Sequence, residues 1–183
     1  MKGLIVLANG FEDTEAICTI DILKRSGMTI VSATPHENLE VVSRYGLNVK
    51  ADIHLAEATE KDFDFLVIPG GRAVFEVWDK NEEISKLIKD FIGAKKLVAA
   101  ICAAPLLVGK IGGYENEKYT CFPGCDEKVT SGKLKGCCGT ITSGNFITGK
   151  AMYYTTDFAL AIVEKLLGKE KKKEILRKIK GRG

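Results

Sequence analysis

The stretch KLVAAICAAPLLV, residues 96–108, carries the pattern that decides the fold of this chain. Its first six residues, KLVAAI, are short and apolar enough for a buried strand, and the segment AAPLLVGKIGG after Cys102 is typical of a helix. A strand that runs directly into a helix is half of a βαβ unit, in which helices connect parallel strands. The stretch therefore predicts an α/β fold, with Cys102 at the turn from strand to helix.

The same alternation of apolar runs and helical segments extends in both directions from this stretch. Strands are predicted over residues 3–8, 28–34 and 64–71, and helices over 14–27, 80–92 and 155–168. Gly27 suits the C-terminal end of the first helix, and Thr155 or Thr156 suits the N-cap of the last. No repeat or linker separates these segments, so the sequence predicts one domain over 1–183 with a largely parallel sheet.

Three segments fit this alternation less well. Residues 39–55 contain short, partly polar β-type runs around Gly46, which favour a hairpin or an edge excursion. Residues 114–150 are rich in turns, with short β signals at TCF, GTITSG and FIT. Near the end of the chain Ile175, Leu176 and Ile179 recur at helical spacing, so a basic helix over about 169–180 is expected to dock on the domain.

Charge and composition narrow the range of functions. The net charge is +3, but residues 169–183 carry eight Lys or Arg and two Glu, so the rest of the chain is slightly acidic. Nucleic-acid binding is therefore not expected, and the basic end is interpreted as the solvated face of a helix rather than a binding arm. The apolar run after Lys2 is too short for a signal peptide or a membrane span. A cytoplasmic protein without a membrane partner is expected.

The chain has six cysteines, and mostly free thiols are expected because the chain is large, shows no export signal and has a βα pattern. They are Cys18, Cys102, Cys121, Cys125, Cys137 and Cys138. A Cys-x3-Cys pair followed by two adjacent cysteines lacks the spacing of a zinc ribbon. No metal site is therefore expected.

Cys102 is the candidate nucleophile. In a parallel sheet the functional crevice lies beyond the carboxyl ends of the strands, where this residue is placed. Its small neighbours, among them Ala103, suit a sharp turn, and a helix N-terminus favours a thiolate, so a lowered pKa is expected. The position suits a small buried cysteine without chemistry equally well.

Two further motifs come from the same ends of other predicted strands. Gly70 and Gly71 follow the segment DFLVIP, and their N–H groups could bind an oxyanion, although Pro-Gly is also ordinary turn punctuation. Glu15 lies in the first turn of the helix after the first strand, beside Glu12 and Asp13. Three acids there could simply offset the helix dipole. A Glu15 buried beside a thiol could instead keep its proton and act as a general acid or base.

Four motifs together resemble the DJ-one branch of the DJ-one/ThiJ/PfpI superfamily. They are GFEDTEA, VIPGG, AICAAP and TTDFALAIVEKLLGK, and their order and spacing match over nearly the whole chain. The resemblance implies a flavodoxin-like, doubly wound domain with helices on both faces of a mainly parallel sheet, and a homodimer. It also implies roles for single residues.

By position, Cys102 resembles the oxidisable nucleophile of this family and Glu15 its protonated acid partner. Gly70 and Gly71, together with Ala103, correspond to the oxyanion and substrate site. Arg44, in the segment VVSRYG, resembles the arginine that members of this branch lend across the dimer interface to the neighbouring active site.

The resemblance implies a function as well. Members of the family are described as glyoxalases or deglycases that need no cofactor and act on methylglyoxal and its adducts, and also as redox sensors and chaperones. The sequence is therefore expected to encode a cysteine enzyme for small α-oxoaldehydes or their adducts. The alternative is a redox sensor that works through oxidation of Cys102.

The chain departs from the family pattern at two places. Phe122 stands where the family commonly has a histidine before proline, and His36 and His54 lie in other segments, so a Cys-His dyad is not expected. The missing histidine also disfavours an amidase or a protease. Tyr153 and Tyr154 stand where a Gly/Pro-rich loop is usual; they either narrow the pocket or pack in the core or at an interface.

The cysteines near Phe122 leave a further alternative open. Cys121 is adjacent to Phe122 and could act as a resolving thiol for Cys102, which would make the site a disulfide switch. No role follows from the sequence for Cys125, Cys137 or Cys138.

Overall fold

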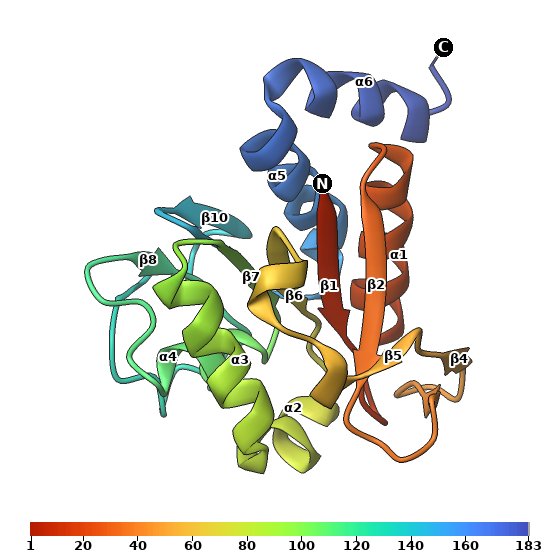
Figure 1. Ribbon diagram of the computed structural model, residues 1–183. Helices are drawn as coiled ribbons and strands as arrows, with labels where there is room; N and C mark the ends of the chain where they lie inside the picture. Colours follow the sequence, from red (N-terminus) through yellow and green to blue (C-terminus); the bar gives the residue numbers. More distant parts are fainter. Residues whose placement is uncertain (183) are drawn as a thin grey trace.

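A computed structural model describes residues 1–182; Gly183, the last residue of the expected domain, lies outside the described residues. Its centre is a seven-stranded sheet in the order β10-β11-β7-β6-β1-β2-β5 (Figure 1). The strands are β1 Lys2–Val6, β2 Thr29–Thr34, β5 Ile53–His54, β6 Phe65–Ile68, β7 Leu97–Ile101, β10 Thr140–Ser143 and β11 Phe146–Gly149. Neighbouring strands are parallel except β10 and β11, which are antiparallel. The expected α/β class with a mainly parallel sheet is confirmed.

Helices cover both faces of the sheet, as in a doubly wound fold. One face is covered by α1 Asp13–Arg25 and α5 Thr155–Leu167, which pack side by side (Figure 1). The other face is covered by α3 Glu82–Gly93, with the short α4 Pro105–Gly109 beside it. A further short helix, α2 Ala73–Glu76, follows β6, and α6 Lys169–Ile179 packs against α5.

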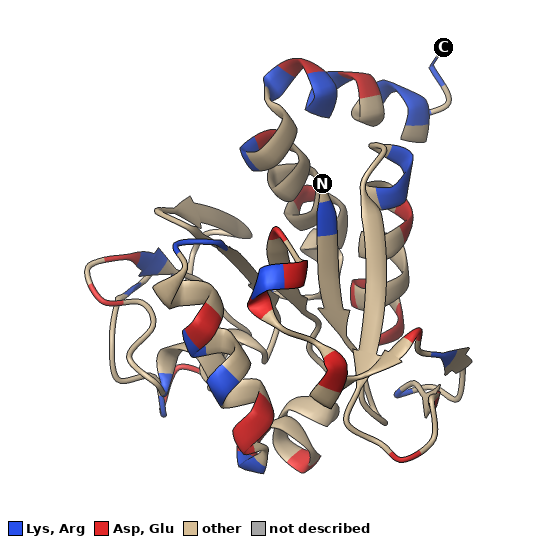
Figure 2. Cartoon of the chain, in the orientation of Figure 1, with Lys and Arg blue, Asp and Glu red and all other residues tan. Residues whose placement is uncertain are grey.

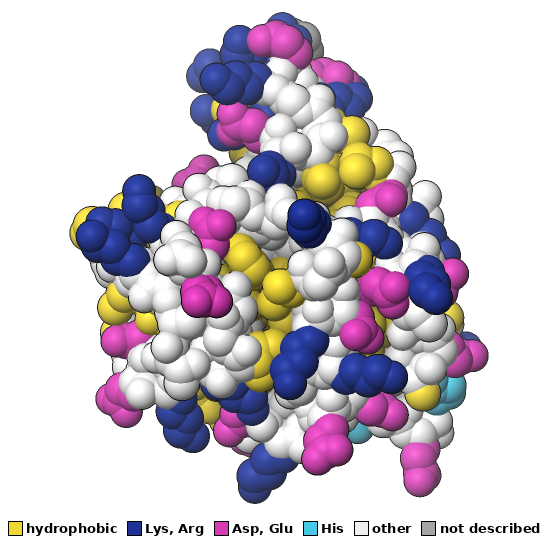
Figure 3. Space-filling model, turned by 60° about the vertical axis from the view of Figure 1, so that its left-hand side comes forward, with side chains coloured by type: hydrophobic (Ala, Val, Ile, Leu, Met, Phe, Trp, Pro, Cys, Tyr) yellow, Lys and Arg dark blue, Asp and Glu magenta, His cyan; other side chains and the backbone are white. Residues whose placement is uncertain are grey.

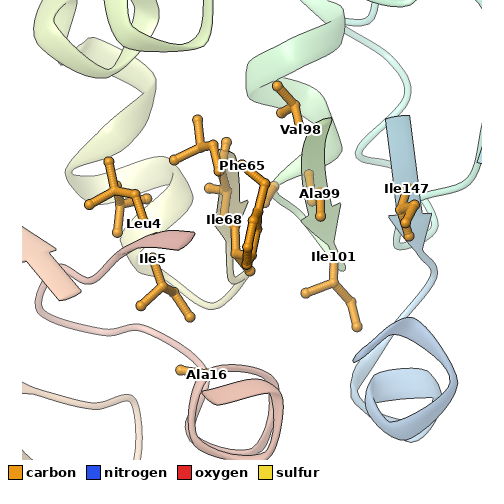
Figure 4. Close-up of a cluster of buried hydrophobic side chains, with 14 of the residues drawn as sticks. Leu4, Ile5, Ala16, Phe65, Ile68, Val98, Ala99, Ile101 and Ile147 are labelled. Carbon is orange, nitrogen blue, oxygen red and sulfur yellow. The ribbon is translucent and has the colours of Figure 1, made fainter. Parts of the chain in front are cut away.

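The core lies between the sheet and these helices. Every residue of β6 and β7 is buried, which explains why both strands are continuously apolar in sequence. Figure 4 shows Leu4 and Ile5 of β1 pointing to opposite sides of the sheet, with Ile5 directed towards the helix that carries Ala16. Gly3 has no room for a side chain, because a Cβ atom there would lie 2.2 Å from the ring of Phe65.

Short strands and single helical turns lie outside the central sheet. The segment expected to form a hairpin contains β3 Glu40–Val42 paired antiparallel with β4 Asn48–Lys50, which confirms that expectation. In the turn-rich segment, β8 Lys118–Tyr119 pairs with β9 Lys133–Leu134. Single 3-10 turns lie at Leu55–Glu57, Glu60–Asp62, Trp78–Lys80 and Met152–Tyr154.

Two expectations about helix ends are wrong. The residue that caps α5 is Tyr154, not Thr155 or Thr156, because a 3-10 turn runs directly into the helix and the Thr155 hydroxyl donates back to the Met152 carbonyl at 2.7 Å. The helix after Cys102 is also shorter than its sequence suggested. It begins at Pro105 and ends at Gly109, and a turn with Gly112 at φ +80° follows.

The C-terminal helix lies where the sequence placed it. Ile175 is fully buried, and Leu176 and Ile179 pack partly against the core. The charged face of α6 alternates in sign along the helix (Figure 2), with ion pairs such as Lys178 to Glu174 at 2.6 Å. In Figure 3 basic side chains gather over this helix at the top of the view, with acidic ones among them. None of the helices within residues 1–182 combines the length and the apolar composition that crossing a bilayer would need.

Truncating Ile175 tests whether α6 is part of the cooperative fold. We expect Ile175→Ala to lower the free energy of unfolding by about 2–4 kcal/mol, because it removes a buried side chain and leaves a cavity between α6 and the core. Urea unfolding followed by the fluorescence of the buried Trp78 measures the change. Lys173→Ala, on the exposed face of the same helix, is the control and should stay within about 0.5 kcal/mol of wild type. Equal stability of both variants would mean that α6 is docked only loosely.

Candidate active site

The sheet order brings three strand ends together. β1, β6 and β7 are adjacent and parallel, so their carboxyl ends open at the same edge of the sheet. The chain leaves β1 towards Glu15 in the first turn of α1, leaves β6 towards Gly70, and leaves β7 directly into Cys102. The three sequence motifs that were separate predictions therefore meet in one place.

Cys102 sits on a strained turn. Its φ angle is +64°, in the left-handed region that L residues other than Gly, Asn and Asp rarely adopt. Two neighbours hold it there: its N–H donates to the Gly149 carbonyl at 2.9 Å, and its carbonyl accepts from the Phe122 N–H at 2.8 Å. Strain of this kind costs about 1–3 kcal/mol and persists only where the surroundings enforce it. The side chain is partly exposed, as a nucleophile must be.

Glu15 is the fully buried acid beside this turn. The Glu12 carboxylate caps α1 by accepting from the Glu15 N–H at 2.7 Å, which fixes the first turn of the helix. The Glu15 side chain has no exposed area; its Oε2 accepts from the Gly70 N–H at 2.8 Å, whereas Oε1 has no hydrogen-bond partner among the described residues. A buried oxygen without a partner is expensive, so it calls for a functional explanation.

Gly70 shows how close the acid and the thiol are. A Cβ atom built on Gly70 would lie 2.6 Å from both Glu15 Oε2 and Cys102 Cβ. Those two atoms are therefore separated by at most twice that distance, and any side chain at position 70 would push them apart. The glycine is required here by close approach.

The protonation of the pair follows from its burial. Burial first, and then the charge of Glu12, raises the pKa of the Glu15 carboxyl from 4.5 to about 7, against the hydrogen bonds from Cys102 and from the Gly70 N–H. Burial also raises the pKa of the Cys102 thiol, and the charge of Glu15 is the second cause. The pair therefore holds its protons up to neutral pH, and Glu15 is the group that gives one up first.

The lowered pKa expected for Cys102 is thus wrong. The expectation relied on a helix N-terminus at the sulfur, but α4 has only 5 residues and begins three positions after Cys102. The Ala103 N–H is the one backbone group that acts to lower the pKa of this thiol, and it does not offset burial. Ionisation of the sulfur consequently needs a base, and Glu15 is adjacent.

The backbone N–H groups of the site divide into two roles. That of Gly70 is occupied by Glu15, so it positions the acid and is not free for an oxyanion. Gly71 and Ala103 line the pocket next to Cys102; within residues 1–182 the Gly71 N–H donates no hydrogen bond, and the Ala103 N–H faces the Cys102 thiol. These two amides remain as the candidate donors to an oxygen anion. Gly71 must be glycine, because its φ is +96° and a Cβ would lie 2.4 Å from the Gly10 carbonyl oxygen.

Cys102 opens into a cavity of about 440 Å³. Two arginines and two phenylalanine rings line its walls together with Cys102 and its neighbours. The lining residues are Arg44, Gly71, Arg72, Phe75, Cys102, Ala103, Phe122, Pro123, Gly124 and Cys125. Phe75 and Phe122 are about half exposed, at 48% and 47%. The cavity is large enough for a small carbonyl compound.

Arg44 reaches this cavity from within its own chain. Its N–H donates to the Phe11 carbonyl at 2.8 Å, and Asp13 at the start of α1 holds the residues on either side through the Ser43 hydroxyl at 2.5 Å and the Tyr45 N–H at 3.3 Å. The pocket thus has an arginine without a second subunit. That Arg44 also serves a dimer mate stays a prediction.

Of the aromatic residues that depart from the family pattern, Phe122 lies at the cavity and Tyr153 and Tyr154 lie elsewhere. Phe122 does line the cavity, and neither His36 nor His54 does, so no Cys-His dyad forms. Tyr153 is 85% exposed, and Tyr154 packs against Gly139, lining a different hollow near α5. The tyrosine pair therefore does not narrow the cavity at Cys102.

The structure rearranges the expected roles of the other cysteines. Cys125, not Cys121, lies on the wall of the Cys102 cavity, because a turn with Gly124 at φ +84° brings it back to Phe122. Cys121 is buried outside this wall. Cys137 and Cys138 lie elsewhere, with their sulfurs 3.9 Å apart, and all described cysteines are free thiols. No cluster of metal-ligating side chains occurs within residues 1–182.

Sequence reasoning missed Arg72, Phe75 and Cys125 as parts of the site. A signal for the first two was available, since both follow the glycine pair in the same strand-end loop. Nothing in the sequence pointed to Cys125, because its place depends on the path of the turn-rich segment.

Known proteins share the sequence and the fold. The DJ-1/PfpI family profile matches residues 1–165. Protein DJ-1 homolog B of Arabidopsis thaliana is 36% identical over 92% of this chain, and a protein named as a deglycase from Pyrococcus horikoshii is 30% identical over 82% of this chain and 90% of its own length. The chain spans only 38% and 44% of the two Arabidopsis homologues. The crystal structure of Drosophila melanogaster DJ-1beta superposes with a TM-score of 0.91, at 28% identity over 97% of this chain and 96% of that one.

The raised pKa of Glu15 predicts a pH dependence of stability. Because the pKa is 4.5 when unfolded and about 7 when folded, the folded chain keeps a proton that the unfolded chain has lost between these values. Stability is therefore full below pH 4.5 and falls as the pH rises to 7, by about 3 kcal/mol at 1.36 kcal/mol per pKa unit. Glu15→Gln stays neutral and can still accept from Gly70, so urea unfolding across this range should show a smaller loss. Parallel curves for both proteins would contradict the assignment.

Proposed function

Since this chain belongs to the DJ-1/PfpI family, we propose that it is a cofactor-independent enzyme that converts small α-oxoaldehydes, or their adducts, with Cys102 as the nucleophile. The observation that carries the proposal is the pairing of a partly exposed thiol with a fully buried carboxyl whose second oxygen has no partner. The name of the deglycase relative from Pyrococcus horikoshii supports the same class of chemistry.

Bond formation begins at the sulfur. The Cys102 thiol adds to the aldehyde carbon while its proton passes to the Glu15 carboxylate. The Gly71 and Ala103 N–H groups, both on the wall of the cavity, hold the oxygen anion that forms. Glu15 then returns its proton to this oxygen, which gives a neutral hemithioacetal.

The second half of the proposed reaction moves a proton from the former aldehyde carbon to the neighbouring carbon. The Glu15 carboxylate removes the hydrogen on the former aldehyde carbon as a proton, which leaves an enediolate. Glu15 returns this proton to the adjacent carbon, and the hydroxyl proton on the former aldehyde carbon passes to the oxygen of that adjacent carbon. The product is a thioester of a 2-hydroxy acid on Cys102. Water hydrolyses this ester and restores the thiol, so the net reaction is addition of one water to the α-oxoaldehyde.

The carboxyl is well matched to this task. A general base works best when its pKa is close to the working pH, and the pKa of Glu15 is raised to about 7. The thiol is not ionised in advance, so the proton transfer to Glu15 is part of the attack. This arrangement performs the acid-base steps without the histidine that Phe122 replaces.

The assembly and location of the protein belong to the same proposal. We propose a cytoplasmic homodimer in which each subunit keeps its own Cys102 cavity and Arg44 lies near the partner. The presence of Arg44 on its own chain's cavity wall supports a role for this residue within each subunit as well.

A second candidate function is redox sensing at the same cysteine. Cys102 would be oxidised by a peroxide to a sulfenic acid with release of water, and by a second peroxide to a sulfinate. The specific observation in its favour is Cys125, a second thiol on the same cavity wall. It could displace water from the sulfenic acid and form a disulfide, the role that the sequence suggested for Cys121.

Turnover of methylglyoxal tests the enzyme. Purified wild type should produce lactate, and Cys102→Ala should lower kcat/KM about a thousandfold or more, because the covalent step is lost. Glu15→Gln should lower it about 10²- to 10⁴-fold. Cys18→Ala, in a helix face turned towards α5, is the matched thiol control and should keep wild-type rates. Equal rates for wild type and Cys102→Ala would rule the proposal out.

Peroxide titration followed by intact-mass and peptide analysis tests the sensor. At a low dose a sensor should gain either two oxygens at Cys102 or a Cys102 to Cys125 disulfide, which lowers the mass by two hydrogens. Cys125→Ala should then shift the product towards the sulfinate, whereas Cys121→Ala should not. Oxidation that begins at the exposed Cys137 and spares Cys102 would argue against sensing at this site.

A further inference from the structure

Two arginines stand over the cavity of Cys102 with no acid opposite them. Arg44 and Arg72 both line its wall, and no Asp or Glu does. Neither guanidinium forms an ion pair within residues 1–182, whereas Arg25 is paired with Asp21 at 2.7 Å. Unpaired cations that share a concave surface raise the local concentration of anions.

The acids near Arg44 do not line the wall of the cavity. Arg44 acts to lower the pKa of both Glu12 and Glu15, but burial outweighs this effect, and both carboxyls have raised pKa values. Glu15 in particular is largely protonated below neutral pH. Asp13 accepts hydrogen bonds from the Ser43 hydroxyl and the Tyr45 N–H.

Backbone contacts hold the loops that carry the two arginines of the cavity wall. Arg44 is tied to the strand-end loop by its N–H bond to Phe11, and Arg72 follows Gly71, whose tight contact with Gly10 leaves the loop one path. Phe75, one helical turn after Arg72, adds an apolar surface to the same cavity wall. A ligand in this cavity is thus surrounded by walls that carry both the thiol and two positive charges.

We infer that the cavity selects α-oxoaldehydes that carry a carboxylate or a phosphate on their carbon chain, and that Arg72 and Arg44 are the residues that determine this specificity. The planar guanidinium groups suit either anion, because both present two oxygens to a fork of N–H donors. The inference rests on the proposed function for its substrate class, but the anion site itself is testable without turnover.

Alkylation of Cys102 isolates the effect of charge. Iodoacetate and iodoacetamide react with the same sulfur and are nearly equal in size, but only iodoacetate is anionic. The ratio of their rate constants at Cys102, measured by peptide mass analysis, should fall about three- to tenfold in Arg72→Gln and in Arg44→Gln, and further in the double variant. Because the ratio cancels changes in the reactivity or folding of the site, a fall reports the anion site.

A control variant and a change of salt concentration test further whether charge sets the ratio of alkylation rates. Arg177→Gln, on α6 away from the cavity, removes the same charge from the protein and should leave the ratio at its wild-type value. Raising the salt concentration to about 1 M should reduce the wild-type ratio towards that of the double variant. A ratio that is the same in wild type and the double variant, or that falls equally in Arg177→Gln, would overturn the inference.

Turnover separates this inference from the proposed function. With 4,5-dioxopentanoate and methylglyoxal as anionic and neutral probes, wild type should show a higher kcat/KM for the former, and Arg72→Gln should lower the ratio of the two mainly through KM. Turnover of methylglyoxal with no preference and no response to Arg72→Gln would overturn the anion site alone. A charge-dependent alkylation ratio without turnover of either probe would support the anion site and overturn the proposed enzyme.

Discussion

The hydrogen bond from the Gly70 N–H to the Glu15 carboxyl is the interaction on which the site depends. It joins the loop after β6 to the first turn of α1 and holds a carboxyl where no water reaches it. The bond exists only because β1, β6 and β7 are neighbours in the sheet, which places three strand ends at one edge. A different strand order would leave the same residues in the sequence and no site in the molecule.

Burial gives the site its chemistry by changing what each group does at neutral pH. A carboxyl in water is a weak base near pH 7, and a thiol is mostly protonated. Burying both groups side by side raises both pKa values, and the thiol holds its proton more firmly than the carboxyl does. Burial brings the pKa of the Glu15 carboxyl close to that of an ordinary histidine.

The fold could be predicted from the sequence because its signals are local. Continuous apolar strands, helical periodicity and glycine ends identified nearly all large elements, and β6 and β7 are apolar throughout because helices cover both their faces. Cys102, Glu15 and the glycine pair were predictable for a similar reason, since each lies directly after a strand.

What escaped prediction depends on paths through irregular segments. The position of Cys125 is set by the turn at Gly124, and the place of Arg44 by its backbone bond to Phe11, neither of which has a periodic signal. The pKa of Cys102 was misjudged because the extent of a short helix and the depth of burial decide it together. The sequence showed that a helix follows but not where it starts.

The left-handed backbone of Cys102 also limits which residues evolution or an engineer can place there. Asparagine, aspartate and glycine adopt such a φ most readily, whereas a β-branched residue such as threonine or valine meets a steep steric penalty. Conversion of the thiol nucleophile into a secondary alcohol is thus blocked by the main chain before any question of reactivity arises. Serine is then the remaining residue that could supply a hydroxyl nucleophile at this position. The geometry of one peptide unit thus restricts which nucleophiles this fold can carry there.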